Sequence, residues 1–157
     1  MHRLLSVTAI LVCASTMTGC AADRSDADTA AIIAFENAAL DRWDKGDVYG
    51  YLDMYADDIT YLSPGTPKRV DGLAAMRRLL EPIQGKIHIE RREMVGPSVQ
   101  RYGDTAILTY NLIDYMRSET GSLSEKRWNS TAVYARIRGE WRIVHSHWSH
   151  PKDGSEP

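Results

Sequence analysis

The chain has 157 residues, 43% hydrophobic and 25% charged, a composition that suits one compact domain. Its formal net charge of -2 gives no attraction for a polyanion, which disfavours nucleic acid as a partner. The 8 Tyr and 4 Trp beside a single Phe favour a pocket or an interface, because Tyr and Trp carry a polar atom that Phe lacks.

The N-terminal stretch has the order of a targeting signal. A short basic start precedes an apolar run, residues 4–12, that is too short to span a membrane. Met17-Thr18-Gly19 follows, directly before Cys20. Residues 1–19 thus resemble a bacterial lipoprotein signal peptide, which implies lipidation of Cys20 and a periplasmic, membrane-anchored protein. Ala21 after the Cys favours the outer membrane, and an ordinary secretory signal is the alternative.

The remaining boundaries follow from composition. Residues 20–29 are small and acidic and are predicted to be a flexible tether, residues 30–150 the folded domain and residues 151–157 a C-terminal tail. Cleavage before Cys20 would remove Cys13, so the mature chain would hold no disulfide and would depend on its hydrophobic core.

Three helices are predicted first. The first begins near Thr29 and ends at Gly46, the second is short, and the third follows Asp71. Their apolar positions at helical spacing are Ile32, Phe35, Ala39 and Trp43, then Val48, Tyr51, Leu52 and Tyr55, then Leu73, Met76, Leu79 and Leu80.

Strands dominate the rest of the chain. One short strand, Ile59 to Leu62, precedes the third helix, and four strands follow that helix. The four cover Lys86 to Val95, Thr105 to Met116, and two strands from Trp128 to Trp148 that turn at Gly139. This segregation of elements predicts an α+β fold, with the helices packed on one side of a curved, mostly antiparallel sheet.

The last hairpin mixes aromatic and polar side chains. Strand alternation puts Trp128, Ser130, Ala132 and Tyr134 on one face of the first strand. On the second strand, Val144, Ser146 and Trp148 share one face, and Trp141, Ile143, His145 and His147 share the other. Such faces fit a partly polar cavity, and ordinary aromatic packing is the alternative.

Several local motifs carry a family resemblance. They are Lys45-Gly46-Asp47 between two helices, Tyr55-Ala56-Asp57-Asp58 before a strand, Asp71-Gly72 at the third helix, and the ending Gly139 to Ser149. Together they resemble the nuclear transport factor 2-like superfamily, its SnoaL-like branch and the association domain of calcium/calmodulin-dependent kinase II. The resemblance implies a cone of bent sheet and three helices around a cavity, with dimerisation through the outer sheet face in many members.

Catalytic residues of the superfamily are mostly replaced. At the positions of the steroid isomerase base, oxyanion donor and acidic partner, this chain has Ser63, Ala39 and Val133, which cannot perform that chemistry. At the scytalone dehydratase site Asp44 remains, but the His position reads as Thr109 or Asn111. Asp44 is therefore a candidate base or an exposed residue at a helix end.

The pocket arginines of the association domain are also missing. Their positions read as Asn111, Ala132 and Trp148, so a cavity here would hold an anion less strongly. No metal site or cofactor is expected, since zinc needs three or four ligands and His145 and His147 supply two on one face. The roles of His145, His147 and His150 stay open, with hydrogen bonding as the simplest.

Three functions remain in view. The first is a periplasmic lipoprotein domain that binds a small, largely apolar molecule in an aromatic cavity. The predicted lining is Trp43, Tyr55, Tyr61, Asn111, Tyr115, Trp128, Ser130 and Trp148. The second is a cyclase, isomerase or dehydratase with Asp44 as base, and the third a dimerisation module without ligand. The face predicted to join a homodimer carries Leu108, Tyr110, Leu112 and Met116.

Overall fold

The computed structural model describes residues 19–118 and 120–152, with side chains from residue 26 onward. Residues 1–18 of the predicted signal peptide, the side chain of Cys20 and residues 153–157 lie outside this described part. Within it, no helix is both long and apolar enough to cross a membrane.

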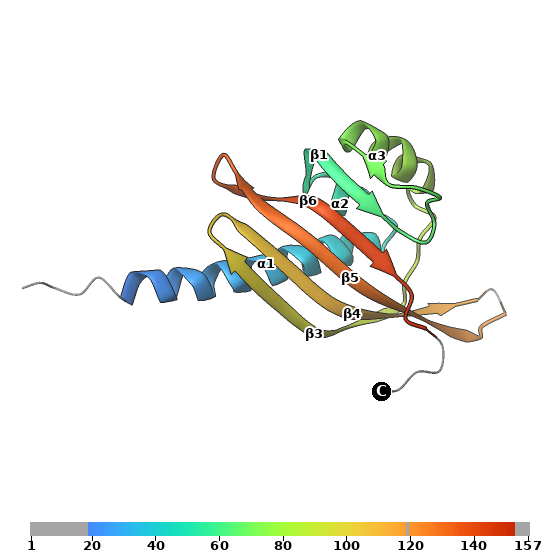
Figure 1. Ribbon diagram of the computed structural model, residues 1–157. Coiled ribbons are helices and arrows are strands. Elements are labelled where there is room, and N and C mark those ends of the chain that lie inside the picture. The colour runs from blue at the N-terminus through green and yellow to red at the C-terminus, as the bar shows by residue number, and fades with distance from the viewer. Residues whose placement is uncertain (1–18, 119, 153–157) are drawn as a thin grey trace, which may run out of the picture.

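One curved sheet forms the frame, and the helices lie against one of its faces (Figure 1). The strand order is β2-β1-β6-β5-β4-β3, antiparallel throughout except for the parallel pair β1–β6. The strands are β1 (Tyr55–Leu62), β2 (Val70–Asp71), β3 (Arg91–Tyr102), β4 (Thr105–Arg117), β5 (Leu123–Ile137) and β6 (Glu140–Ser149). The helices are α1 (Gly19–Trp43), α2 (Tyr49–Leu52), α3 (Leu73–Leu80) and the 3-10 turn η1 (Glu81–Ile83). The predicted α+β architecture is confirmed.

Helix α1 begins at Gly19, ten residues before the predicted start near Thr29. The stretch interpreted as a tether is rich in Ala, the strongest helix former, and its helical turns run directly into the amphipathic part. Asp28 ties this part of α1 to the sheet, because its carboxylate pairs with Arg101 of β3 at 2.8 Å and with Arg136 of β5 at 2.7 Å.

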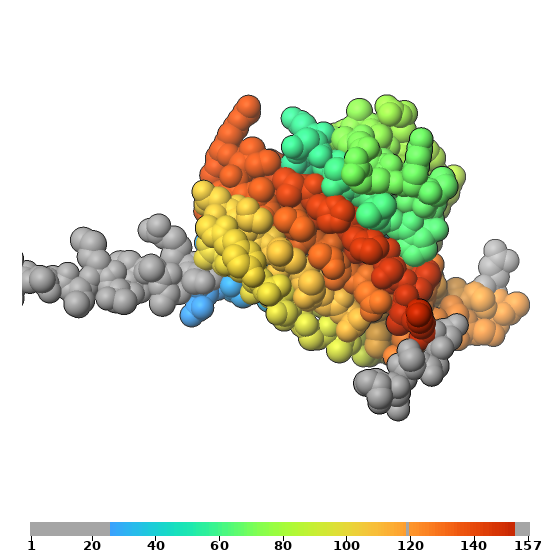
Figure 2. Space-filling model, in the orientation of Figure 1, coloured from blue at the N-terminus to red at the C-terminus, as the bar shows by residue number. Residues whose placement is uncertain are grey.

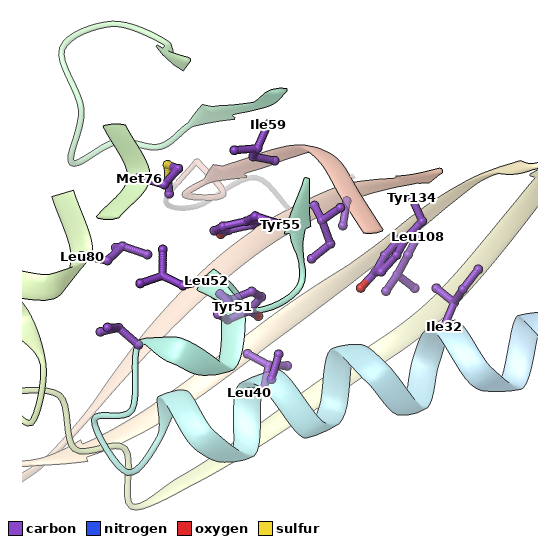
Figure 3. Close-up of a cluster of buried hydrophobic side chains, with 14 of the residues drawn as sticks. Ile32, Leu40, Tyr51, Leu52, Tyr55, Ile59, Met76, Leu80, Leu108 and Tyr134 are labelled. Carbon is purple, nitrogen blue, oxygen red and sulfur yellow. The ribbon is translucent and has the colours of Figure 1, made fainter. Parts of the chain in front are cut away.

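The buried face of α1 differs from the predicted stripe at one position. Phe35 is 44% exposed, whereas Glu36 is 1% exposed and takes its place between Ile32 and Leu40. The core then fills the space between α1, α2 and α3 and the inner face of the sheet (Figure 3).

Strand β4 faces the opposite way from the prediction. Leu108, Tyr110 and Leu112 are buried against the helices, so the face expected to join a homodimer is the inner face of the sheet. Both faces of β4 carry apolar residues, with Ile107 and Ile113 on the other side, so alternation alone did not distinguish them.

A bulge in β6 also changes which side chains share a face. His145 pairs with Val133 but Ile143 pairs with Tyr134, so Val144 is an extra residue on this strand. The bulge brings Ile143 onto the inner face with Ser146 and Trp148, where Ile143 is fully buried. The prediction that Ile143 shares a face with His145 is therefore wrong.

The outer face of the sheet has no helix over it in the view of Figure 2, which shows strands β3 to β6 as one continuous surface. Ile107, Ile113 and Val133 lie on this face and are partly exposed. The fold thus leaves a half-apolar sheet face uncovered, while the inner face and the helices build the site.

Candidate functional site

The inner face of the sheet and the helices form a partly open pocket of about 90 Å³. Six aromatic side chains form most of its wall. The lining residues are Leu40, Trp43, Tyr51, Tyr55, Tyr61, Ser63, Leu80, Leu112, Asp114, Trp128 and Trp148. The lining residues come from α1, α2 and α3 and from strands β1, β4, β5 and β6, and Ser63 directly follows β1. The pocket is therefore positioned by most of the fold.

The structure brings five of the eight predicted lining residues around the pocket: Trp43, Tyr55, Tyr61, Trp128 and Trp148. Ser130 is buried on the inner face but does not reach the pocket wall. Tyr51 and Asp114, which were not among the predicted lining residues, also line it.

Asn111 and Tyr115 lie on the outer face, so their prediction as lining residues is wrong. The Asn111 amide donates to Asn129 Oδ1 at 2.7 Å, and the Arg91 guanidinium lies 3.7 Å from the Tyr115 ring centre. Both residues occupy odd positions of β4, and the even positions of that strand face inward.

The aromatic wall is cross-braced. Trp148 meets Tyr110 edge-on at 5.9 Å and Trp128 edge-on at 6.0 Å. Tyr51 stacks on Tyr55 at 6.0 Å, and both lie between the helices and the sheet (Figure 3). Such geometries are favourable for aromatic pairs, so these contacts stabilise the wall.

Asp114 of β4 supplies the one carboxylate of the lining among the described residues. It is 7% exposed, and its Oδ2 accepts a hydrogen bond of 2.9 Å from the Trp128 indole Nε1. Burial raises the pKa of the Asp114 carboxyl, although the indole hydrogen bond acts in the opposite direction. The available sequence signal was strand alternation, which puts Asp114 on the same face of β4 as Tyr110 and Leu112.

A second carboxylate, Glu36, lies behind the pocket wall. It accepts hydrogen bonds from the hydroxyls of Tyr51 at 2.9 Å, Tyr110 at 2.6 Å and Tyr134. Burial, followed by the Glu36 charge, raises the pKa of all three tyrosines well above the usual value, which keeps them protonated as donors. Helical spacing with Ile32 and Leu40 was the signal that would have revealed this inward Glu.

Asp44 does not line the pocket. Its carboxylate pairs with Arg92 of β3, and Arg92 also pairs with Asp41 at 2.6 Å and donates to the backbone carbonyl of Asn37 at 3.2 Å. Burial raises the pKa of the Asp44 carboxyl even though Arg92 opposes that shift. Its contacts are those of a residue that ties the end of α1 to β3.

The three C-terminal histidines are spread over two regions. His145 Nδ1 lies 2.8 Å from Thr60 Oγ1 on the outer face, and burial lowers the pKa of this imidazole. His147 is exposed beside it, whereas the His150 ring packs on Trp128 at 4.2 Å. In the described part of the chain, no group of three or more His, Cys, Asp or Glu side chains is arranged to hold a metal ion.

The fold is that of nuclear transport factor 2-like proteins. A nuclear transport factor 2-like protein of unknown function from Pseudomonas putida has a TM-score of 0.70 and 23% identity, over 82% of this chain and 89% of that one. A candidate ketosteroid isomerase from Parabacteroides distasonis has a TM-score of 0.68 and 28% identity, over 78% and 86%. The association domain of the Caenorhabditis elegans kinase has a TM-score of 0.70 and 20% identity, over 81% and 98%.

Within this fold, one particular family matches the chain. The family model of the calcium/calmodulin dependent protein kinase II association domain matches residues 28–151. The chain therefore belongs to this association-domain family. No curated protein is significantly similar to the chain.

Proposed function

We propose that this chain is a small-molecule binding domain whose ligand lies in the aromatic pocket. The open, braced pocket beside Trp148 is the observation that supports this function. Its volume of about 90 Å³ is well below the roughly 300–1,000 Å³ of pockets for drug-sized ligands, so the occupant is a small molecule or the head group of a larger one.

Native mass spectrometry of the protein purified from its own host tests this function. A bound molecule should be released on denaturation, and Trp148→Ala should weaken its binding by about 1–3 kcal/mol through lost stacking area. Trp141→Ala is the matched control, because Trp141 packs against Arg136 at 4.5 Å and does not line the pocket. Equal retention by both variants would place the ligand elsewhere.

An enzymatic function with Asp44 as base has less support. The Asp44 carboxylate is engaged by Arg92 and is absent from the lining. Asp44→Asn should therefore leave ligand binding unchanged. If Asp44 were a catalytic base, this variant would instead lose catalytic turnover.

We also propose that the domain forms a homodimer through the outer face of its sheet. That face is uncovered and carries Ile107, Ile113 and Val133 (Figure 2). The association domain of the C. elegans kinase and a kinase hub from S. rosetta are among the structures with this fold.

The lipoprotein-like stretch before Cys20 supports a lipid-anchored, periplasmic location. Cell fractionation tests this location. Cys20→Ser should move the protein from the membrane fraction to the soluble periplasmic fraction, and a wild-type protein that is already soluble would exclude the anchor.

A further inference from the structure

The pocket combines aromatic faces with negative charge. Among the residues that the structure describes, the lining includes six Tyr or Trp rings and the Asp114 carboxylate, and no Lys, Arg or His. Rings of Trp and Tyr carry negative charge on their faces, so both kinds of group attract a cation. A neutral apolar ligand would use the rings alone and would leave the desolvated carboxylate without a partner.

Asp114 has no ion-pair partner among the described residues, and Lys126 and Arg92 act on its charge only from farther away. The indole of Trp128 donates to Oδ2, which leaves Oδ1 for a ligand. No Lys, Arg or His of the described residues comes within 4.0 Å of this carboxylate, although it is 7% exposed. Buried carboxylates normally have a cationic partner, so its absence here indicates a place for one.

The two nearest cations along the sheet are engaged elsewhere. Arg92 pairs with Asp114 in strand register but binds Asp41 and Asp44. Lys126, the register partner on β5, has its ammonium 4.2 Å from the centre of the Trp128 ring. An ammonium group of the protein itself thus lies over one ring of the pocket wall.

Glu36, which lies behind the pocket wall, makes the aromatic rings of that wall more attractive to a cation. Tyr51 donates its hydroxyl hydrogen to Glu36 at 2.9 Å while its ring forms part of the pocket wall. A phenol that donates to a carboxylate is polarised, and its ring face becomes more negative. Tyr110, which donates to Glu36 at 2.6 Å, packs edge-on against Trp148 and extends the effect to the far wall.

We propose that the ligand is a small organic cation, an alkylammonium or quaternary ammonium group, held with its charge beside Asp114 and its apolar substituents on the Tyr and Trp rings. This inference rests on the proposed function as a binding domain and names the class of its ligand. The volume of about 90 Å³ fits a compact head group, and because the pocket is partly open a longer substituent can extend into solvent.

A matched pair of probes tests the charge. Choline and 3,3-dimethylbutan-1-ol have the same shape, but only choline is a cation. Calorimetric titration should show choline binding at least tenfold more tightly than the alcohol. Saturable shifts of the indole N–H resonances of Trp43, Trp128 and Trp148 should accompany choline binding and locate it in the pocket.

Two variants complete the test. Asp114→Asn keeps an oxygen for the Trp128 indole but removes the charge, so choline binding should weaken at least tenfold and binding of the alcohol should not change. Asp58→Asn makes the same chemical change at an exposed position of β1 and should alter neither. If Asp114→Asn does not fold, the wild-type ratio of the two probes and the location of the indole shifts still decide the question.

The outcomes separate the two proposals. Equal or tighter binding of the alcohol would overturn the cation inference and leave the binding function standing. Binding of neither probe would also overturn the inference, while a different molecule released from the host-purified protein would still support the binding function. Choline binding that Asp114→Asn leaves unchanged would assign the cation to a site other than this carboxylate.

Discussion

Glu36 is the residue on which the interior polar network depends. Three tyrosines from α2, β4 and β5 donate to its carboxylate, so one side chain of α1 connects the helices to two central strands. Each hydroxyl is buried, and a buried donor without an acceptor costs about 1–3 kcal/mol. The cluster therefore contributes to stability as well as to the polarity of the pocket wall.

Removal of that carboxylate should destabilise the domain strongly. Glu36→Ala leaves three buried hydroxyls without an acceptor, and the free energy of unfolding should fall by about 3 kcal/mol or more. Tyr134→Phe removes one donor and should cost less, about 1.5–3 kcal/mol. Chemical denaturation measures both, with exposed Glu93→Ala as the control; a loss for Glu36→Ala no larger than the control would show that the cluster does not stabilise the fold.

Asp114 should make stability depend on pH in the opposite sense to a paired carboxylate. Burial raises the folded-state pKa of Asp114, and the negative charge of Asp44 raises it further. The Trp128 hydrogen bond and the positive charges of Lys126 and Arg92 act in the opposite direction. The stability that this group contributes is fully present below its unfolded pKa, about 3.9, and is lost as the pH rises through the folded pKa.

The test compares two thermal unfolding curves across pH. Asp114→Asn should be more stable than wild type at pH 7, and the difference should shrink as the solution becomes acidic and the wild-type carboxyl takes up its proton. Exposed Asp58→Asn should show no such difference. A variant less stable than wild type at pH 7 would mean that Asp114 is paired favourably in the folded protein.

At the scale of elements, the turn between α1 and α2 depends on a glycine. Gly46 has φ of +83°, and a Cβ there would lie 2.9 Å from both Gly85 Cα and Ile87 O. Gly46 O also accepts the backbone hydrogen bond of Gly85 at 2.8 Å, so this turn docks directly on the segment that leads to β3.

Gly46→Ala should therefore cost more than backbone strain alone. Positive φ in a non-glycine residue costs about 1–3 kcal/mol, and the backbone contacts add to it. Gly139→Ala, with φ of +88° and nothing within 4 Å of the added Cβ, pays only the strain and is the matched control. Equal losses in the free energy of unfolding for the two variants would show that the close contact contributes nothing.

Much of the element order followed from the sequence, because turn glycines and apolar periodicity report local structure. The glycines at 46 and 139 were predicted at turns and have positive φ. Two of the assignments that failed concern strand faces. Strand β4 is apolar on both sides, and the bulge at Val144 changes the alternation within β6, so neither face could be fixed without the partner strands.

The aromatic nature of the candidate site was predicted better than the individual residues that line it. Tyr and Trp enrichment indicated an aromatic cavity, and five predicted rings surround the pocket. Asp114 and Glu36 were missed because an isolated acidic residue is most often a solvated one. The helical spacing of Glu36 with Ile32 and Leu40 indicated an inward position, whereas the burial of Asp114 depends on which face of β4 the helices cover.

At the scale of the whole molecule, the uncovered sheet face should set the state of assembly. Val133→Glu places a charge at the centre of that face and should convert a homodimer to a monomer in analytical ultracentrifugation at micromolar concentration. Ala74→Glu adds the same charge on the exposed side of α3 and should leave the dimer intact. A wild-type monomer at that concentration would contradict the proposed interface.

The central claim is that the aromatic pocket holds a ligand. A crystal structure of the protein purified from its own host tests this claim most directly. We expect density for a small molecule between Tyr61 and Trp148 with a cationic group beside Asp114. A pocket closed by the protein's own side chains, or one that holds only water in that preparation, would contradict the claim.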